Sequence, residues 1–469
     1  MKKTIKNIAA FMFAATIISS CDTVDFGDTN DNPNGPTAPI TSQLLSQAQI
    51  SVSTIINHVD GINYVQHITE GQYPGPSRYA TLEFSYNGWY TGPVQNLNRI
   101  IEVNEDPEQA EEASLFGNNN NQIAAAKLLR VYFLQYMTDT WGYLPWTEAF
   151  KGIEGTTPKF DSQQSLYTLM FAEVDDALSK INSGSGPVGD MIFGGDMDQW
   201  KSFGNTLKMV MALRISDADA ATAKTKFEQA VASGALISSN AGNLVYTFGS
   251  DDNSDNQWED RFESREDYVM SETLINSLKA KTDPRMEKYS DPSTATGLYT
   301  GAENGKVNGN TPDFAFITKT VIKDPVYKSP IYTYAQTQFS LAEAATKGWN
   351  TGGTAAAHFK SGIEASMMQW GVAAADMNTY TAANTSSTMA DIAYEKWVSL
   401  YLNGPEAWAE WRRLDAPALT PSIYANDQRI PVRHAYSSSV EDNNPANYAA
   451  MVAAQGADNL HTKLWWDKN

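Results

Sequence analysis

The sequence predicts a mainly α-helical protein that carries one long, loop-rich region. Two observations predict the helices. Apolar residues recur at three- and four-residue spacing over much of the chain, and alternating strand–helix–strand units are absent. A third observation predicts the loops: from 284 to 336, prolines, glycines and aromatic residues replace the helical pattern.

The N-terminus is predicted to be an export signal. Lys2, Lys3 and Lys6 give a basic start, an apolar run covers 8–18, and two serines precede Cys21. The run is too short to span a membrane as a helix but suits the core of a secretory signal. Cys21 is the only cysteine of the chain. The pattern resembles a bacterial lipoprotein signal, so we expect 1–20 to be removed and Cys21 to carry the lipid anchor.

Residues 21–40 are predicted to be an extended tether, because they are polar, acidic and interrupted by proline and glycine. Asp28, Asn30 and Asn32 have the spacing of a calcium loop. Pro33 and Pro39 stand where such a loop needs glycine and glutamate, so an EF-hand is excluded here.

The remaining chain, 41–469, is predicted to be a single helical domain with a loop-rich insertion at about 240–336. Short strands are expected at 243–248 and 314–322. No clean 34-residue repeat is visible, but helix pairs of about that size recur, which is compatible with tandem helix hairpins. Helical spacing covers 41–58, 121–138, 163–181, 196–217, 222–233, 268–280, 337–347, 354–369, 388–402 and 405–413.

Composition excludes several classes of protein. The 469 residues carry 54 acidic and 34 basic side chains, a net charge of −20, which disfavours a nucleic-acid binder. A single cysteine excludes a disulfide framework and a cysteine-based zinc site. No apolar run reaches the roughly 18 residues of a membrane-spanning helix.

Enzyme motifs are almost absent. Residues 184–189 match GxGxxG, but they follow a predicted helix and not a strand, so they are interpreted as an interhelical loop. The P-loop, HExxH and GxSxG motifs are missing, and the histidines suggest no metal site. A pair of carboxylates, as in glycosidases, stays open, because 54 acids offer many pairs. No cofactor is expected apart from calcium, for which the candidate is an acidic loop of Asp251, Asp252, Asn253, Asp255 and Asn256.

Seven segments, in order along the chain, resemble the SusD/RagB family of nutrient-binding outer-membrane lipoproteins of Bacteroidetes. The resemblance covers almost the whole chain, and its ordered set of segments is more specific than any one of them. The segments are 132–146 (YFLQYMTDTWGYLPW), 200–215 (WKSFGNTLKM with the trailing LRI), 283–286 (DPRM), 334–344 (YAQTQFSLAEA), 408–414 (WAEWRRL), 429–433 (RIPVR) and 464–467 (LWWD).

This resemblance implies a SusD-like fold with tetratricopeptide-like helix pairs and a loop-rich ligand-binding part. It implies a protein on the outer face of the outer membrane that works with a SusC-like TonB-dependent transporter and is not an enzyme. Ligands in the family are mostly oligosaccharides, with peptides in the RagB branch. The quoted motifs themselves are expected to be structural, with the rings of 141–146 in the core and Arg412 and Arg413 paired internally.

Ligand residues must therefore be predicted from chemistry. A sugar offers an apolar ring face and a rim of hydroxyl groups, which aromatic rings and polar side chains can bind. Four loop regions hold both kinds of residue, and we expect at least one to contribute. The candidates are Tyr73, Arg78 and Tyr79; Asn256, Trp258 and Arg261; Tyr299; and Phe314 with Phe316.

Four functions remain compatible with the sequence. The first is an oligosaccharide-binding surface lipoprotein that delivers its ligand to a transporter. The second is the same architecture binding peptides, for which a basic ligand would suit the acidic chain. The third is a surface glycoside hydrolase, which needs two facing carboxyl groups, one with a raised pKa. The fourth is a structural lipoprotein whose only partner is the transporter.

Overall fold

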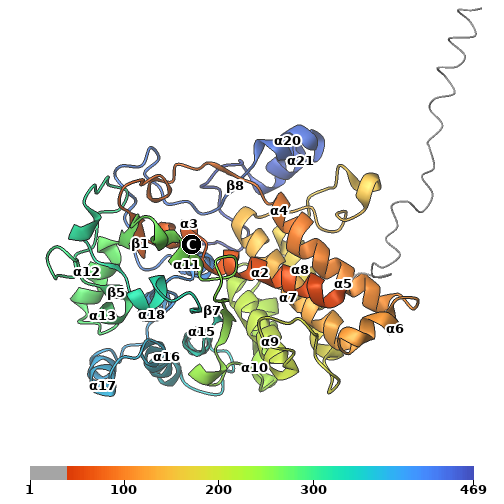
Figure 1. The fold of residues 1–469 in the computed structure, drawn as a ribbon, viewed down its shortest axis with the longest axis horizontal. Helices are drawn as coiled ribbons and strands as arrows, with labels where there is room; N and C mark the ends of the chain where they lie inside the picture. The colour runs from red at the N-terminus through yellow and green to blue at the C-terminus, as the bar shows by residue number, and fades with distance from the viewer. Residues whose placement is uncertain (1–39) are drawn as a thin grey trace, which may run out of the picture. The chain divides into compact units, whose positions relative to one another are not determined.

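Helices make up most of the regular structure, as the sequence predicts (Figure 1). The computed structural model describes residues 40–469, so the export signal, Cys21 and the predicted tether up to residue 39 lie outside the described residues. Residues Ile40–Asn469 form one compact unit. No helix in this described part is both long and apolar enough to cross a membrane.

The helices of the first half match the predicted segments closely and add several short ones. Consecutive helices pack against each other as pairs, most extensively α7 with α8 and α9 with α10, which confirms the predicted helix-pair scaffold. The helices are α2 (Thr41–Ile56), α3 (Val59–Tyr64), α4 (Asn87–Trp89), α5 (Gln95–Glu105), α6 (Ala110–Ala113), α7 (Asn119–Trp141), α8 (Gln163–Lys180), α9 (Met197–Arg214) and α10 (Ala220–Ala232).

The second half continues this arrangement, with α15 and α16 as its most extensive pair. Its helices are α11 (Gln257–Glu263), α12 (Glu272–Ala280), α13 (Met286–Tyr289), α14 (Lys319–Ile322), α15 (Tyr334–Thr346), α16 (Ala355–Gln369), α17 (Ala374–Ala383), α18 (Met389–Ser399), α19 (Gly404–Leu414), α20 (Ser438–Asn443) and α21 (Pro445–Gln455).

Local signals explain where the helices begin and end. Side chains of Ser162 and Asp196 accept hydrogen bonds from the first backbone amides of α8 and α9, which otherwise lack partners. Thr388 and Asp391 form a reciprocal capping box at α18. Helix α7 ends at Gly142, whose φ of 94° is open to glycine at little steric cost.

The largest core lies around α7, which is buried on nearly all faces by α2, α5, α8 and α9. Of the rings of the 141–146 motif, Trp141 is 2% exposed and lies in this core as expected, whereas Tyr143 and Trp146 are half-buried and pack against it. A second core joins α3, α12, α18 and α19 to the loop-rich insertion, and a third lies between α15 and α16.

Strands are short and occur, within residues 40–469, as four separate pairs. One pairing corrects a prediction: the helix expected at 268–280 begins only at Glu272, because Tyr268–Met270 pairs with Ile68–Glu70. The pairs are β1 (Ile68–Glu70) antiparallel to β4 (Tyr268–Met270), β2 (Glu83–Phe84) parallel to β8 (Ala435–Tyr436), β3 (Leu244–Thr247) antiparallel to β7 (Lys328–Tyr332), and β5 (Ser290–Asp291) antiparallel to β6 (Phe316–Ile317).

A network of buried charges joins α15, α18 and α19. Arg413 donates to Glu343 at 2.5 and 2.7 Å and to Glu410 at 2.6 Å, and Lys396 bonds both carboxylates. Burial alone would raise the pKa of Glu343, but Arg413 and Lys396 outweigh it and lower this pKa to about 2. The guanidinium carbon of Arg412 lies 3.7 Å from the ring centroid of Trp408. The side chains of Arg412 and Arg413 therefore both make their contacts inside the protein, as expected.

The C-terminal tail closes the largest core. Trp466 is fully buried, and its indole nitrogen donates to Asp139 on α7 at 2.8 Å. Asp139 also accepts from Tyr167 on α8 at 2.6 Å and pairs with Arg214 on α9 at 3.0 Å. In Figure 1 the C-terminus accordingly lies in the middle of the view.

Candidate functional site

A groove of about 670 Å³ opens among loop segments that are far apart in the sequence. We call it the loop groove. Its walls mix charged, hydroxyl and aromatic side chains with only a few apolar ones. It is lined by Arg78, Tyr79, Ala80, Leu82, Glu83, Asn426, Asp427, Arg429, Ala435, Tyr436, Ser437, Ser438, Glu441, Tyr448, Asp458, Asn459, Leu460 and His461.

The parallel pair β2–β8 brings these segments together. Glu83 lies opposite Ala435 in this pair, and the Glu83 carboxylate accepts from the backbone amide of Ser438 at 2.9 Å. On the other side of the strand, the segment before β2 turns sharply, with Tyr79 in the left-handed region at φ 58°. Two strands of two residues each therefore fix the relative positions of the groove walls.

Asp427 carries a fixed negative charge at one end of the loop groove. It pairs with Arg429 at 2.6 Å and with His461 at 3.0 Å. The hydrogen bond from Arg429 lowers the pKa of Asp427, and the charge of His461 adds to this effect. Asp427 therefore stays ionised at neutral pH, and its oxygens can accept hydrogen bonds.

Asp458 organises the opposite wall. It accepts from Arg433 at 3.0 Å, from the backbone amide of Tyr436 at 3.1 Å and from the hydroxyl of Tyr448 at 3.0 Å. Burial and this bond to Asp458 raise the pKa of Tyr448 to about 12. The Tyr448 hydroxyl is therefore neutral at physiological pH. Its hydrogen is donated to Asp458, and its oxygen can accept a further hydrogen bond.

An exposed aromatic ring stands at the margin of the loop groove, two residues before Asn426. The Tyr424 side chain is 36% exposed, and the guanidinium carbon of Arg78 lies 5.8 Å from its ring centroid. Arg78 also donates to the backbone oxygen of Gly305 at 2.6 Å, and the Tyr424 hydroxyl donates to Glu303 at 3.1 Å. We call these two residues the Arg78–Tyr424 edge: it offers a ring face beside charged hydrogen-bonding groups.

Among the predicted ligand residues, only Arg78 and Tyr79 line the loop groove. Tyr79 is just 6% exposed, and burial raises its pKa, with polar groups of Ser422, Gln66 and Asn304 opposing that shift. Its ring is mainly a structural wall. Tyr73 is 60% exposed, as a ligand residue should be, but it lies outside the groove lining, beside Arg265 at 5.4 Å.

The prediction for Trp258 is wrong, because its ring is fully buried in the second core and packs edge-on against Tyr268. Asn256 is fully buried too: its side chain caps α11 and donates to the backbone oxygen of Val321 at 2.6 Å. Arg261 lies 4.8 Å over the Trp258 ring and donates to the Asn57 backbone at 3.3 Å. The whole region is structural.

The other two predicted regions are also part of the second core. Phe316 is 7% exposed and forms strand β6, so its ring is unavailable and its prediction is wrong. Phe314 and Tyr299 are half-buried and pack against the same core. Burial raises the pKa of Tyr299. None of the three lines the loop groove.

The sequence prediction missed the C-terminal half of the groove. Tyr424, Asp427 and Arg429 stand in 421–429, a segment with a proline, an aromatic ring and several polar residues. It meets the same chemical criteria that selected the other loops. The pairing of β8 with β2 could not be inferred, since two-residue strands carry no periodicity.

A second groove, of about 580 Å³, lies beside α5, α7 and α8. Trp146 and the exposed ring of Phe150 line it together with Lys127 and Arg130. Both basic residues are committed to ion pairs, Lys127 with Asp176 and Arg130 with Glu173, each at 2.7 Å. This groove therefore offers a ligand fewer free charged groups.

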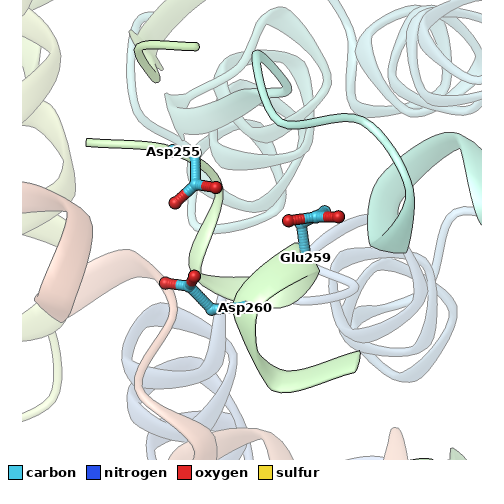
Figure 2. Close-up of side chains that lie close together, drawn as sticks. All are labelled: Asp255, Glu259 and Asp260. Carbon is cyan, nitrogen blue, oxygen red and sulfur yellow. The ribbon is translucent and has the colours of Figure 1, made fainter. Parts of the chain in front are cut away.

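One group of carboxylates within residues 40–469 has the spacing of a metal site. It consists of Asp255, Glu259 and Asp260 (Figure 2). Of the predicted acidic loop, only Asp255 belongs to it. Asp251 instead accepts from Ser254 at 2.6 Å, and the Asn256 side chain is used to cap α11.

Comparison with known proteins gives a clear family match. Residues 33–437 match the profile of the SusD-like family described as starch-binding and associating with the outer membrane. No curated protein sequence matches the chain.

Solved structures agree with this match. A chitin-binding protein is 26% identical, with a TM-score of 0.80, and the alignment covers 92% of this chain and 100% of that one. A SusD homologue from Bacteroides fragilis is 20% identical, with a TM-score of 0.80 and the same coverage. A chitin-binding SusD homologue from Flavobacterium johnsoniae is 22% identical, with a TM-score of 0.73, covering 92% and 97%.

Proposed function

Because the chain belongs to the SusD-like family, we propose that it is a surface lipoprotein of the outer membrane that binds oligosaccharide and passes it to a SusC-like TonB-dependent transporter. In this proposal, Cys21 carries the lipid, and the unit formed by residues 40–469 captures the ligand. The basic start, apolar run and single cysteine of the N-terminus support the anchor.

The observation that carries the binding proposal is the Arg78–Tyr424 edge beside the loop groove. An exposed ring can cover the apolar face of a sugar, and the groove behind it offers Asp427, Tyr448 and serine hydroxyls for the sugar's rim. The groove volume of about 670 Å³ is within the usual range for small-molecule sites.

Binding without hydrolysis is the chemistry that we propose. A glycosidase needs a carboxylic acid whose raised pKa keeps it protonated until it meets the leaving group. Asp427 in the loop groove has the opposite property, because Arg429 and His461 lower its pKa. It is suited to accept hydrogen bonds from hydroxyl groups.

Glycan binding can be tested with soluble protein that starts at Asp22 and so retains the whole compact unit. We would titrate it with oligosaccharides of N-acetylglucosamine and of starch by calorimetry, since the similar structures include chitin-binding proteins and the family is described as starch-binding. Tyr424→Ala should weaken binding of the active glycan about tenfold, or about 1.4 kcal/mol, because it removes the stacking face.

Phe150→Ala is the matched control, since it removes an aromatic ring of similar exposure, 40% against 36%, from the other groove. It should leave the affinity unchanged. If Phe150→Ala weakens binding and Tyr424→Ala does not, the site lies at α5, α7 and α8. Release of shorter sugars on prolonged incubation would instead establish a hydrolase.

A peptide ligand is the second candidate. The acidic chain, with a net charge of −20, favours a basic peptide over an acidic one. A panel of basic peptides in the same calorimetric experiment distinguishes the two. Binding of peptides alone, with sensitivity to salt, would replace the glycan in the proposal.

A further inference from the structure

Three carboxylates converge at the start of α11, away from the loop groove (Figure 2). Asp255 lies just before the helix, and Glu259 and Asp260 lie in its first turns. One oxygen atom from each residue lies within 4.8 Å of the others. Figure 2 shows the three side chains directed toward a common space.

A second observation at this place concerns the burial of Asp255. The residue is only 8% exposed, and its Oδ1 atom is buried with no hydrogen-bond partner among residues 40–469. A buried carboxylate oxygen without a partner is unfavourable, since it has lost its water and gained nothing in return. A cation bound at this atom would offset that cost.

The backbone holds Asp255 in this position. On one side, the Ser254 oxygen accepts from the amide of Gly249 at 2.8 Å. On the other, the amide of Asn256 donates to the Pro325 oxygen at 2.9 Å. Because both neighbours are fixed, the backbone of Asp255 is held beside the start of α11, within reach of the two acids of the helix.

No salt bridge joins a basic side chain to any of the three acids in the described part of the protein. Two basic side chains act on the cluster by their charge, but they form hydrogen bonds elsewhere: Lys323 donates to the Phe262 backbone at 3.2 Å, and Arg261 to that of Asn57 at 3.3 Å. Burial and neighbouring carboxylates raise the pKa values of Glu259 and Asp260, and Lys323 and Arg261 oppose this shift only in part.

We propose that Asp255, Glu259 and Asp260 bind a calcium ion. The donor set is made of oxygen atoms only, which favours a hard cation over zinc or copper. Oxygen atoms bound to one calcium ion at about 2.3–2.6 Å lie within about 5 Å of one another, a condition that the cluster meets. Calcium accepts several carboxylates in a flexible geometry, whereas magnesium is usually bound by one or two, so three carboxylates favour calcium. Water can complete the shell, because Asp260 is exposed.

The ion would join the loop before α11 to the helix itself. Trp258, between Asp255 and Glu259 in sequence, anchors α11 in the second core. Calcium bound at this place would therefore stabilise the loop-rich insertion, and its effect would appear as a rise in melting temperature.

The test uses the full chain, purified in detergent and freed of metal with a chelator. Calorimetric titration with calcium chloride should show one ion per chain. The dissociation constant should lie below about 10⁻³ M, the upper end for extracellular calcium sites. Asp260→Asn should weaken binding at least tenfold, and this exposed substitution should leave the fold intact. Terbium, excited through tryptophan, should luminesce when bound in wild type and lose most of that signal in Asp260→Asn.

Asp252→Asn is the matched control, because it removes one negative charge from the same stretch at an exposed residue outside the cluster. Its affinity for calcium should stay within twofold of wild type. Equal binding by wild type and Asp260→Asn would overturn the assignment. So would the absence of both heat and a melting shift at about 10 mM calcium, tenfold above the expected range, or tighter binding of magnesium.

Discussion

Glu70 is a carboxyl group that the fold buries at the base of the segment leading to the loop groove. It ends strand β1, opposite Tyr268, and is 6% exposed. Burial raises its pKa from 4.5 to about 7, and the nearby charges of Asp267 and Asp60 contribute. The folded protein therefore binds more protons than the unfolded chain between these two pH values.

The free energy of unfolding should fall as the pH rises from about 4.5 to about 7, because the folded protein must either keep the proton on Glu70 or bury its negative charge. Glu70→Gln removes that cost. At pH 8 the variant should be more stable than wild type by about 1–2 kcal/mol, and at pH 4 the two should match. Melting curves at both pH values measure this. Glu266→Gln, an exposed acid nearby, should show no such difference, and a gain at pH 4 would contradict the explanation.

The residue scale is also where sequence prediction failed most often. Trp258 and Tyr424 both stand in polar, aromatic-containing stretches, yet one is fully buried and the other 36% exposed. A signal existed for Trp258: Phe262 follows four residues later, which is the spacing of one helical face, and both rings are in the second core. For Tyr424 no local pattern indicates exposure, since that depends on the distant Arg78 and Glu303.

At the scale of elements, the loop between α8 and α9 shows why a motif can mislead. Its glycines match GxGxxG, but their role is to let two backbone segments approach each other more closely than a side chain would allow. A Cβ atom on Gly186 would lie 1.8 Å from the oxygen of Gly195, and one on Gly189 would lie 2.6 Å from that of Ser42. The interpretation as an interhelical loop is confirmed, because α8 ends at Lys180 and α9 begins at Met197.

Gly186→Ala should therefore destabilise the protein by about 3 kcal/mol, since backbone must move to admit the methyl group. Gly194→Ala is the control in the same loop. Its φ of 61° disfavours alanine, but no atom lies within 4 Å of the added Cβ, so the loss should be about 1 kcal/mol. Urea denaturation of both variants gives the comparison, and equal losses would show that backbone strain, not the clash, dominates.

Long helices could be predicted because each carries its own periodic signal. The predicted 163–181 and 354–369 differ from α8 and α16 by only a residue or so at either end. The paired strands could not be predicted in the same way. Phe84 pairs with Tyr436 in β2–β8, although more than 350 residues separate them in the sequence. No pattern within either two-residue strand indicates its partner.

At the scale of the whole molecule, the tail and the first helical pairs depend on each other. Trp466 bonds Asp139, and its ring lies 5.5 Å from the guanidinium of Arg214 and 4.9 Å from that of Arg412. Without the indole, Asp139 loses one of the donors that compensate its burial, and a cavity opens in the largest core.

Trp466→Ala should cost about 3–5 kcal/mol of folding free energy, measured by urea denaturation. Trp465→Ala, one residue earlier, removes a ring of the same size that is only half-buried, and it should cost clearly less. Similar losses for the two variants would mean that Trp466 does not hold the tail in place.

The fold class and the scaffold of helix pairs could thus be predicted from periodicity, whereas the loop groove could not. Its walls come from 78–83, 426–441 and 448–461, which come together only in the tertiary structure. Arg78, which lines the groove, could be predicted because its own segment combines aromatic rings with a basic side chain. Asp427 and His461 could not be predicted in this way, because they form a pair, with 3.0 Å between the His461 Nε2 and an Asp427 oxygen, although 34 positions separate them in the sequence.

The bond between Trp466 and Asp139 also bears on how the protein folds. The two residues are 327 positions apart in the sequence. Contacts of such large sequence separation slow folding. The largest core therefore stays incompletely closed until Trp466 reaches Asp139, and during this interval the helices of the first half should be more susceptible to proteolysis than in the folded protein.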